Sequence, residues 1–177
     1  MPEPSCGHRA RPRDHLSARI GNSVTTQVRS RTGTMMTSVA RGSFTVELAP
    51  LPFDGQAEGS RLGRMSIDKR ITGDLEATTS GQMLSAMTGT KGSAGYVAIE
   101  RVEGTLHGRK GSFVLQHTGT MNRGVPGLSV TVVPDSGTGE LEGLQGEFKI
   151  IIAEGKHSYE FAYVLRQSES GESVVQP

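Results

Sequence analysis

Several features that would assign this 177-residue chain to a class of protein are missing from it. It has no tryptophan. Its longest apolar runs are only a few residues, such as 150–152, so no segment is long enough to span a membrane. No repeat with a period of about 20–50 residues is visible. The only cysteine, Cys6, cannot form an intramolecular disulfide, which favours a reducing, cytoplasmic location.

Positive charge is also missing from most of the chain. The net charge is +1, but residues 1–34 hold six arginines against Glu3 and Asp14, a net of +4, so the remainder carries −3. A mildly acidic body without a basic patch does not favour binding to phosphates. We therefore expect no nucleic-acid partner and no membrane partner.

Residues 1–37 are predicted to be a disordered basic extension, because they lack apolar periodicity and are rich in Arg, Ser, Thr, Pro and Gly. No apolar stretch follows the charges, so the segment is not a secretory signal. Its prolines disfavour the amphipathic helix of a transit peptide. Translation from Met35 or Met36 is the other interpretation. Residues 169–177 are expected to form a flexible tail.

Glycine, in contrast, is abundant: the chain has 24, without a collagen period, which favours tight turns and kinked strands. Alternation of apolar and polar residues recurs between turn signals from Ser43 onward, as in half-buried strands. One strand is expected over 95–103, with Gly104 separating it from another that begins at Thr105. Residues 80–92 are ambiguous between a strand end with a loop and a single helical turn.

This pattern predicts an all-β domain over residues 38–168, with eight or nine strands and no long helix. Short connections favour a closed antiparallel, lipocalin-like barrel of about eight strands, with a sandwich as the alternative. Closure removes exposed sheet edges. A barrel of this size has room for packed side chains or for one small ligand.

Six short blocks support this prediction by resemblance. They are 73–76, 96–102, 104–109, 111–117, 136–143 and 157–159. In this order they resemble the uncharacterised bacterial domain-of-unknown-function family 3224, whose members look like barrels of the allene-oxide-cyclase-like type. The resemblance implies the barrel but no activity, and the active-site pattern of allene oxide cyclase cannot be placed on this sequence. Asp135 departs from the small turn residue expected there.

Polar side chains on apolar strand faces are the strongest functional candidates. His117 shares a strand face with Phe113 and Leu115, and Glu100 shares one with Ala98 and Val102. If these faces point inward, desolvation shifts their pKa values toward neutrality, where they could act as acid and base. The catalytic candidates are Glu100, His117 and Tyr163. The candidate ligand-binding residues are Tyr96, Glu100, Phe113, Leu115, His117, Tyr159, Phe161 and Tyr163.

Known catalytic motifs are incomplete. The segment 135–138 has the Asp-Ser-Gly-Thr form of an aspartic-protease loop, but only one copy exists, and an ordinary turn explains it. The segment 137–139 lacks the third glycine of a dinucleotide fingerprint. We expect no cofactor and no metal. A ligand set from His107, His117, His157 and a nearby glutamate is left open.

Three functional classes follow. The first is a protein that binds a small apolar or amphipathic molecule inside the barrel. The second is an isomerase- or cyclase-like enzyme that uses the same interior groups as acid and base. The third is a packed barrel that serves as an oligomeric scaffold, and assembly into a homo-oligomer is left open for all three.

Overall fold

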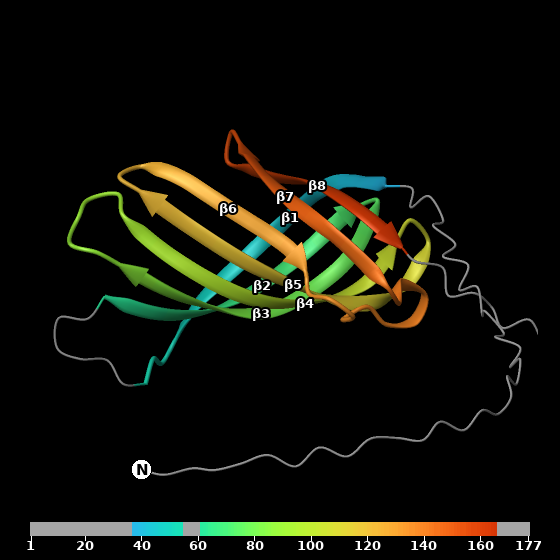
Figure 1. Ribbon diagram of the computed structural model, residues 1–177, viewed down its shortest axis with the longest axis horizontal. Helices are drawn as coiled ribbons and strands as arrows, with labels where there is room; N and C mark the ends of the chain where they lie inside the picture. Colours follow the sequence, from blue (N-terminus) through green and yellow to red (C-terminus); the bar gives the residue numbers. More distant parts are fainter. Residues whose placement is uncertain (1–36, 55–60, 166–177) are drawn as a thin grey trace, which may run out of the picture. The chain divides into compact units, whose positions relative to one another are not determined.

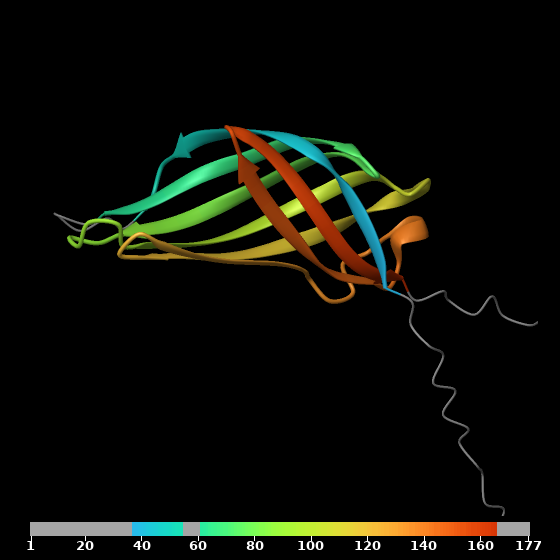
Figure 2. The same cartoon turned by 90° about the horizontal axis from the view of Figure 1, so that it is seen from above.

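The computed structural model describes residues 37–54 and 61–165, which form a closed antiparallel barrel (Figures 1 and 2). Each strand pairs with the next along the chain, and the last pairs with the first. The predicted all-β closed barrel is thus confirmed. The strands are β1 (Ser38–Leu51), β2 (Leu62–Gly73), β3 (Leu75–Met87), β4 (Ala94–Leu106), β5 (Arg109–Asn122), β6 (Val125–Val132), β7 (Leu144–Ala153) and β8 (Lys156–Leu165).

The only helical element in the described part of the chain is a 3-10 turn, η1 (Gly139–Leu141). It buries Leu141, whose side chain lies against Gly111 of β5. No helix of the described residues is long and apolar enough to cross a membrane. The predicted extension lies outside the described residues except for Thr37, as do Cys6 and the tail 169–177.

One local expectation needs correction, and one ambiguity is resolved. Gly104 does not end a strand, because β4 continues through it and pairs it with Ala77 and Gly111. A Cβ at Gly104 would overlap the neighbouring strand at Ala77, so glycine is needed there for close strand approach. The chain turns instead at His107 and Gly108, whose φ angles of 46° and 81° suit a two-residue hairpin. The ambiguous residues 80–92 are strand up to Met87, followed by a loop.

One half of the barrel interior is tightly packed. Inward-facing side chains from all eight strands meet there, including the stacked ring pairs Phe148–Tyr159 and Phe113–Phe161. We call this the closed half. Its fully buried members include Ala40, Leu75, Val102, Leu106, Phe113, Leu115, Leu144, Tyr159 and Phe161.

The opposite half is not filled. β1 and β8 pair only as far as Phe44 and His157, and β6 pairs with β7 only at Thr131 and Glu147. The β7–β8 hairpin therefore stands apart from the neighbouring strand ends (Figure 1). Strand register assigns to the interior a set of apolar residues that remain partly or largely exposed. We call these the open half: Leu48, Met65, Met83, Tyr96, Met121, Leu128 and Ile152.

Candidate functional site

A cluster of three ionisable side chains lies inside the barrel between the open and closed halves. Lys69 of β2, Glu100 of β4 and His117 of β5 all occupy inward positions of their strands, and all three are buried. The Lys69 Nζ donates to Glu100 Oε2 over 2.6 Å. The His117 Nε2 lies 2.9 Å from the same oxygen. Oε2 is thus the common point of the cluster.

Two residues of β3 make room for this cluster and hold it. Gly81 pairs directly with Glu100, and a Cβ on Gly81 would lie 2.8 Å from the Glu100 Cα. Thr79 accepts a hydrogen bond from the Lys69 backbone N–H through its Oγ1, at 3.0 Å. The absence of a side chain at position 81 therefore lets Lys69 reach across β3 to the carboxylate.

The cluster keeps Glu100 ionised. Burial raises the pKa of this carboxyl, but the contacts with His117, Lys69 and Thr79 lower it more, and the net pKa is about 2. This corrects the expectation that desolvation would bring the pKa of Glu100 toward neutrality. A carboxylate with such a low pKa is a weak base and is not a proton donor at neutral pH. Its role is therefore electrostatic or hydrogen-bonding.

The cluster also leaves hydrogen-bonding capacity unused. Glu100 Oε1 is buried without a hydrogen-bond partner among the described residues. The His117 Nε2 contacts Oε2 at 2.9 Å without forming a well-aligned hydrogen bond. Buried polar atoms are nearly always satisfied, and an unsatisfied one costs about 1–3 kcal/mol. These two atoms are therefore able to bind a further polar group.

Tyr96 belongs to the same region. It lies four residues before Glu100 on β4, on the same inward face, and its ring lies across Gly119 of β5. Its pKa is raised by burial and further by the negative charge of Glu100. The phenol therefore stays protonated at neutral pH. Tyr96, Glu100 and His117 are the predicted site residues that the structure brings together.

The other predicted site residues lie in the closed half. Phe113, Leu115 and Phe161 are at most 1% exposed. Leu75 donates its backbone N–H to the Tyr159 hydroxyl at 3.0 Å. The hydroxyl of Tyr163 lies 2.7 Å from the His107 Nδ1, in the β4–β5 turn, so Tyr163 is not part of the Glu100 cluster. Ligand contact for these residues stays a prediction, and their observed role is packing.

The sequence analysis missed Lys69 and Thr79. The signal for Lys69 was present, because it lies two residues from both Ile67 and Ile71 and must therefore share their inward face. A lysine on an apolar strand face between two isoleucines indicates a buried partner of opposite charge. For Thr79 no comparable signal exists, since threonine is common on either face of a strand.

The three histidines that the structure describes, His107, His117 and His157, are not gathered at one point. No group of three or more His, Cys, Asp or Glu that could hold a metal occurs among residues 37–54 and 61–165. His107 contacts Tyr163, His117 contacts Glu100, and His157 packs against the Phe44 ring at 5.1 Å. The three side chains thus have different partners, which removes the support for a shared ligand set.

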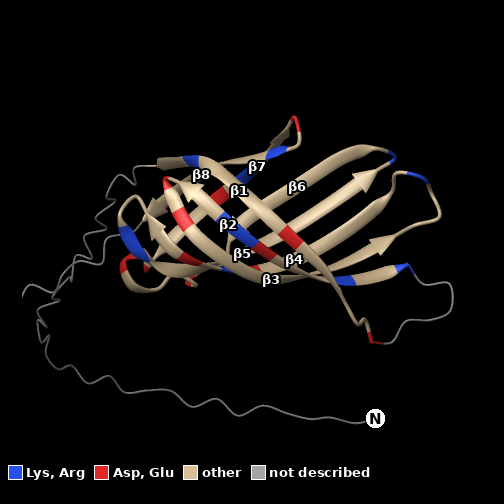
Figure 3. Ribbon diagram, turned by 180° about the vertical axis from the view of Figure 1, so that it is seen from behind, with Lys and Arg blue, Asp and Glu red and all other residues tan. Residues whose placement is uncertain are grey.

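The charged residues are unevenly distributed over the strands (Figure 3). The segments 77–87, 94–99, 112–122 and 125–132 of β3 to β6 contain no Asp, Glu, Lys or Arg. The parts of these segments that lie beyond the Glu100 cluster form the wall of the open half on four adjacent strands. Neither face of this wall has an ionic side chain of its own.

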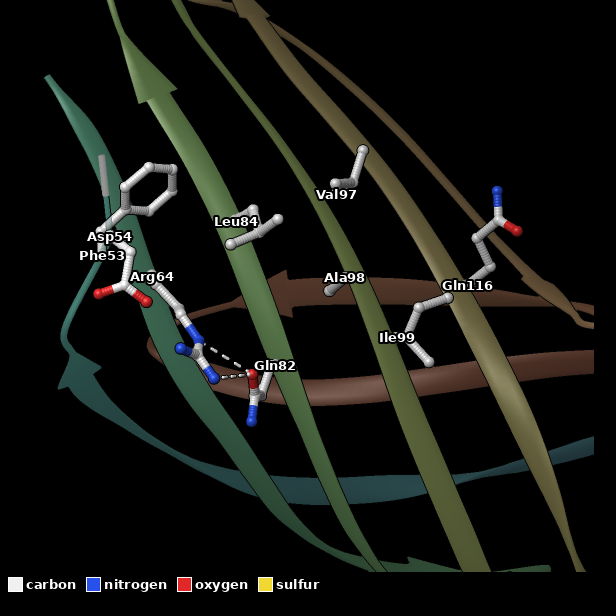
Figure 4. A pocket seen from close by; sticks show the side chains of 9 residues that line it. All are labelled: Phe53, Asp54, Arg64, Gln82, Leu84, Val97, Ala98, Ile99 and Gln116. Atoms are coloured by element: carbon white, nitrogen blue, oxygen red, sulfur yellow. Dashed lines mark hydrogen bonds between the residues drawn. The ribbon is translucent and has the colours of Figure 1, made fainter. Parts of the chain in front are cut away.

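The outer face of this wall carries a groove of about 630 Å³ (Figure 4). Leu84, Val97 and Ile99 point into it from β3 and β4, and Phe53 covers one side. At its edge the Arg64 Nη2 donates to Gln82 Oε1 at 2.7 Å. The groove lies outside the barrel and contains none of the predicted site residues.

Fold and cluster together define a class: closed eight-stranded antiparallel barrels with an ion pair buried in the interior. A family model described as "Protein of unknown function (DUF3224)" matches residues 40–163, so the chain belongs to this family. It is also similar to a crystal structure of a protein of unknown function from the DUF3224 family of Shewanella oneidensis MR-1. The two are 50% identical, with a TM-score of 0.72, over 75% of this chain and 100% of that one. No curated protein matches the chain. The allene-oxide-cyclase-like character stays a prediction.

Proposed function

We propose that this barrel binds a small apolar or amphipathic molecule in its open half. The observation that carries the proposal is Glu100, which is 0% exposed, has an unpartnered Oε1, and lies two inward positions along β4 from Tyr96, a member of the open half. Leu48, Leu128 and Ile152 face the interior, yet they are 49%, 46% and 66% exposed. Apolar side chains gathered around a few polar groups are typical of small-molecule sites.

The two alternatives fit less well. A packed scaffold requires the inward residues to be buried along the whole barrel, whereas those of the open half are not. An isomerase that used Glu100 as its acid or base would require a pKa near the working pH for that group, whereas the pKa of Glu100 is about 2. Binding uses the open half and the cluster without requiring proton transfer.

The test is a titration with N-phenyl-1-naphthylamine, an uncharged probe whose fluorescence rises in apolar surroundings. Leu128→Asp places a charge in the open half. Leu84→Asp is the matched control, because Leu84 is equally exposed, at 47%, but lines the outer groove. Burying an unpaired charge beside an apolar probe is costly, so we expect Leu128→Asp to weaken binding by about tenfold or more and Leu84→Asp to leave it unchanged.

The opposite pattern contradicts the proposal. Loss of binding in Leu84→Asp alone would assign the probe to the outer groove. Absence of saturable binding by the wild-type protein would argue for the scaffold. Circular dichroism of each variant shows whether the barrel is intact.

A further inference from the structure

We infer that the bound molecule presents an uncharged hydroxyl group to Glu100 Oε1, so that the ligand class is a neutral, alcohol-bearing amphipath. This inference rests on the proposed function and specifies the polar end of the ligand. It follows from the charges, the unpartnered atoms and the wall residues of the same region.

The charges come first. Lys69 and Glu100 form an ion pair at 2.6 Å with side chains 5% and 0% exposed, so their charges cancel inside the barrel. No other Asp, Glu, Lys or Arg lies on the adjoining segments of β3 to β6. With His117 neutral beside this pair, a charged ligand group placed here would have no counter-ion left to pair with, and an unpaired buried charge is strongly unfavourable. An uncharged polar end avoids this penalty.

The unpartnered atom determines whether the ligand group must donate or accept a hydrogen bond. Glu100 Oε1 belongs to an ionised carboxylate, which accepts hydrogen bonds and donates none. The ligand group must therefore donate. A carboxylate ligand cannot donate and is repelled by Glu100, and an ether or a ketone has no proton to give. Among uncharged groups a hydroxyl meets the requirement.

Tyr96 can complete the site from the side of the open half. Its phenol stays protonated because burial and the charge of Glu100 raise its pKa, so it can donate a hydrogen bond to an uncharged ligand. Only Ala98, a small side chain, stands between Tyr96 and Glu100 on the inward face of β4. A polar oxygen of the ligand beyond Ala98 can therefore accept from Tyr96.

The wall accommodates the rest of such a molecule. Met65, Met83 and Met121 face the open half from β2, β3 and β5. Methionine adapts to different apolar shapes. From Glu100 to the first residue of β4, Ala94, the strand extends six residues, or about 20 Å at about 3.3 Å per residue. An alkyl chain of medium length fits along this wall.

The experiment compares four probes with the same alkyl chain by displacement of N-phenyl-1-naphthylamine at about pH 8, where carboxylic acids are ionised. The probes are 1-decanol, 1-methoxydecane, decanoate and decylammonium. We expect 1-decanol to bind about tenfold more tightly than each of the others, because it alone is an uncharged donor.

A double variant, Glu100→Leu with Lys69→Leu, supplies the control. Replacing both charges removes the acceptor at position 100 and avoids an unpaired buried ion, while the remaining His117 can donate equally to an alcohol or an ether oxygen. We expect this variant to bind 1-decanol and 1-methoxydecane equally well. Preserved preference for 1-decanol in the variant would show that Glu100 does not read the hydroxyl.

The outcomes separate the inference from the proposed function. If the fluorescent probe binds in the open half but decanoate, decylammonium or 1-methoxydecane matches 1-decanol in the wild type, the inference is wrong and the binding function stands. If neither the fluorescent probe nor any of the four molecules binds, the proposed function is wrong, and the inference falls with it.

Discussion

Replacing Glu100 by glutamine keeps the size of the side chain and removes the charge that faces Lys69. The two groups lie 2.6 Å apart, and both side chains are buried, so the substitution leaves an ammonium inside the barrel without its counter-ion. Breaking a buried ion pair in this way destabilises a protein by about 3–5 kcal/mol. A domain of this size has a free energy of unfolding of about 5–15 kcal/mol. We therefore expect Glu100→Gln to lose a large fraction of the stability.

The partner substitution completes a double-mutant cycle. Lys69→Met alone leaves the carboxylate buried and unpaired, and we expect a loss of the same size. The double variant removes both charges, and apolar or uncharged replacements of a whole buried pair are often neutral or better. It should be at least about 2 kcal/mol more stable than either single variant.

Urea unfolding followed by circular dichroism measures these differences. Glu103→Gln is the matched control: Glu103 is also on β4 and pairs with Arg101 at 3.1 Å, but the two side chains are 70% and 54% exposed. An exposed pair contributes about 0–1 kcal/mol. Equal losses in Glu100→Gln and Glu103→Gln would refute the reasoning, as would a double variant no more stable than the singles.

Three further results follow from the same coordinates. The folded-state pKa of Glu100, about 2, lies below its ordinary value of 4.5, so its stabilisation of about 3 kcal/mol is present above pH 4.5 and is lost as the pH falls toward 2. Urea unfolding across this range should therefore show a steeper fall in the free energy of unfolding for the wild type than for Glu100→Gln. Parallel curves would contradict this expectation. Gly119→Ala should lower the free energy of unfolding by about 1–3 kcal/mol in a thermal melt, because the added Cβ overlaps the Tyr96 ring. Gly95→Ala should lower it little, because the nearest atom to its added Cβ is 3.8 Å away. Similar losses in the two variants would argue against the packing of Tyr96 on Gly119. Tyr159→Phe should lower the free energy of unfolding by about 1–3 kcal/mol, because the buried Leu75 N–H loses its acceptor. Tyr163→Phe should lower it less, because its partner His107 is partly exposed. The reverse order in urea unfolding would be inconsistent with these contacts.

Much of the fold was predictable from residue alternation. In β4 and β5 alternation separates the two strand faces, and the face that carries Glu100 and the face that carries His117, taken as inward only conditionally, are the inward ones. The errors fall at glycines. Gly104 looks like a break in the sequence, but in the barrel it is a point of close strand approach, which depends on the neighbouring strand and not on local propensity.

The candidate site was predictable only in part. Alternation places Glu100, His117 and Tyr163 inside, but their mutual distances depend on the stagger between strands, which leaves no mark on a single strand. Tyr163 therefore reaches His107 at the end of the closed half, while Glu100 meets His117. The division into two halves was not visible either, because inward residues are apolar in both. It arises from the short pairing of β6 with β7.

The short pairing of β6 with β7 also affects how readily the β7–β8 hairpin opens. β6 and β7 pair only at Thr131 and Glu147, and β1 leaves β8 after Phe44, so the tip of the β7–β8 hairpin is joined weakly on both sides. Segments with few partners open at a small fraction of the global unfolding free energy. If the barrel binds a molecule above Glu100 as proposed, that molecule can leave past this hairpin while the other strands stay paired. Its affinity would then depend on the Glu100 cluster, and its residence time on how often the β7–β8 hairpin opens.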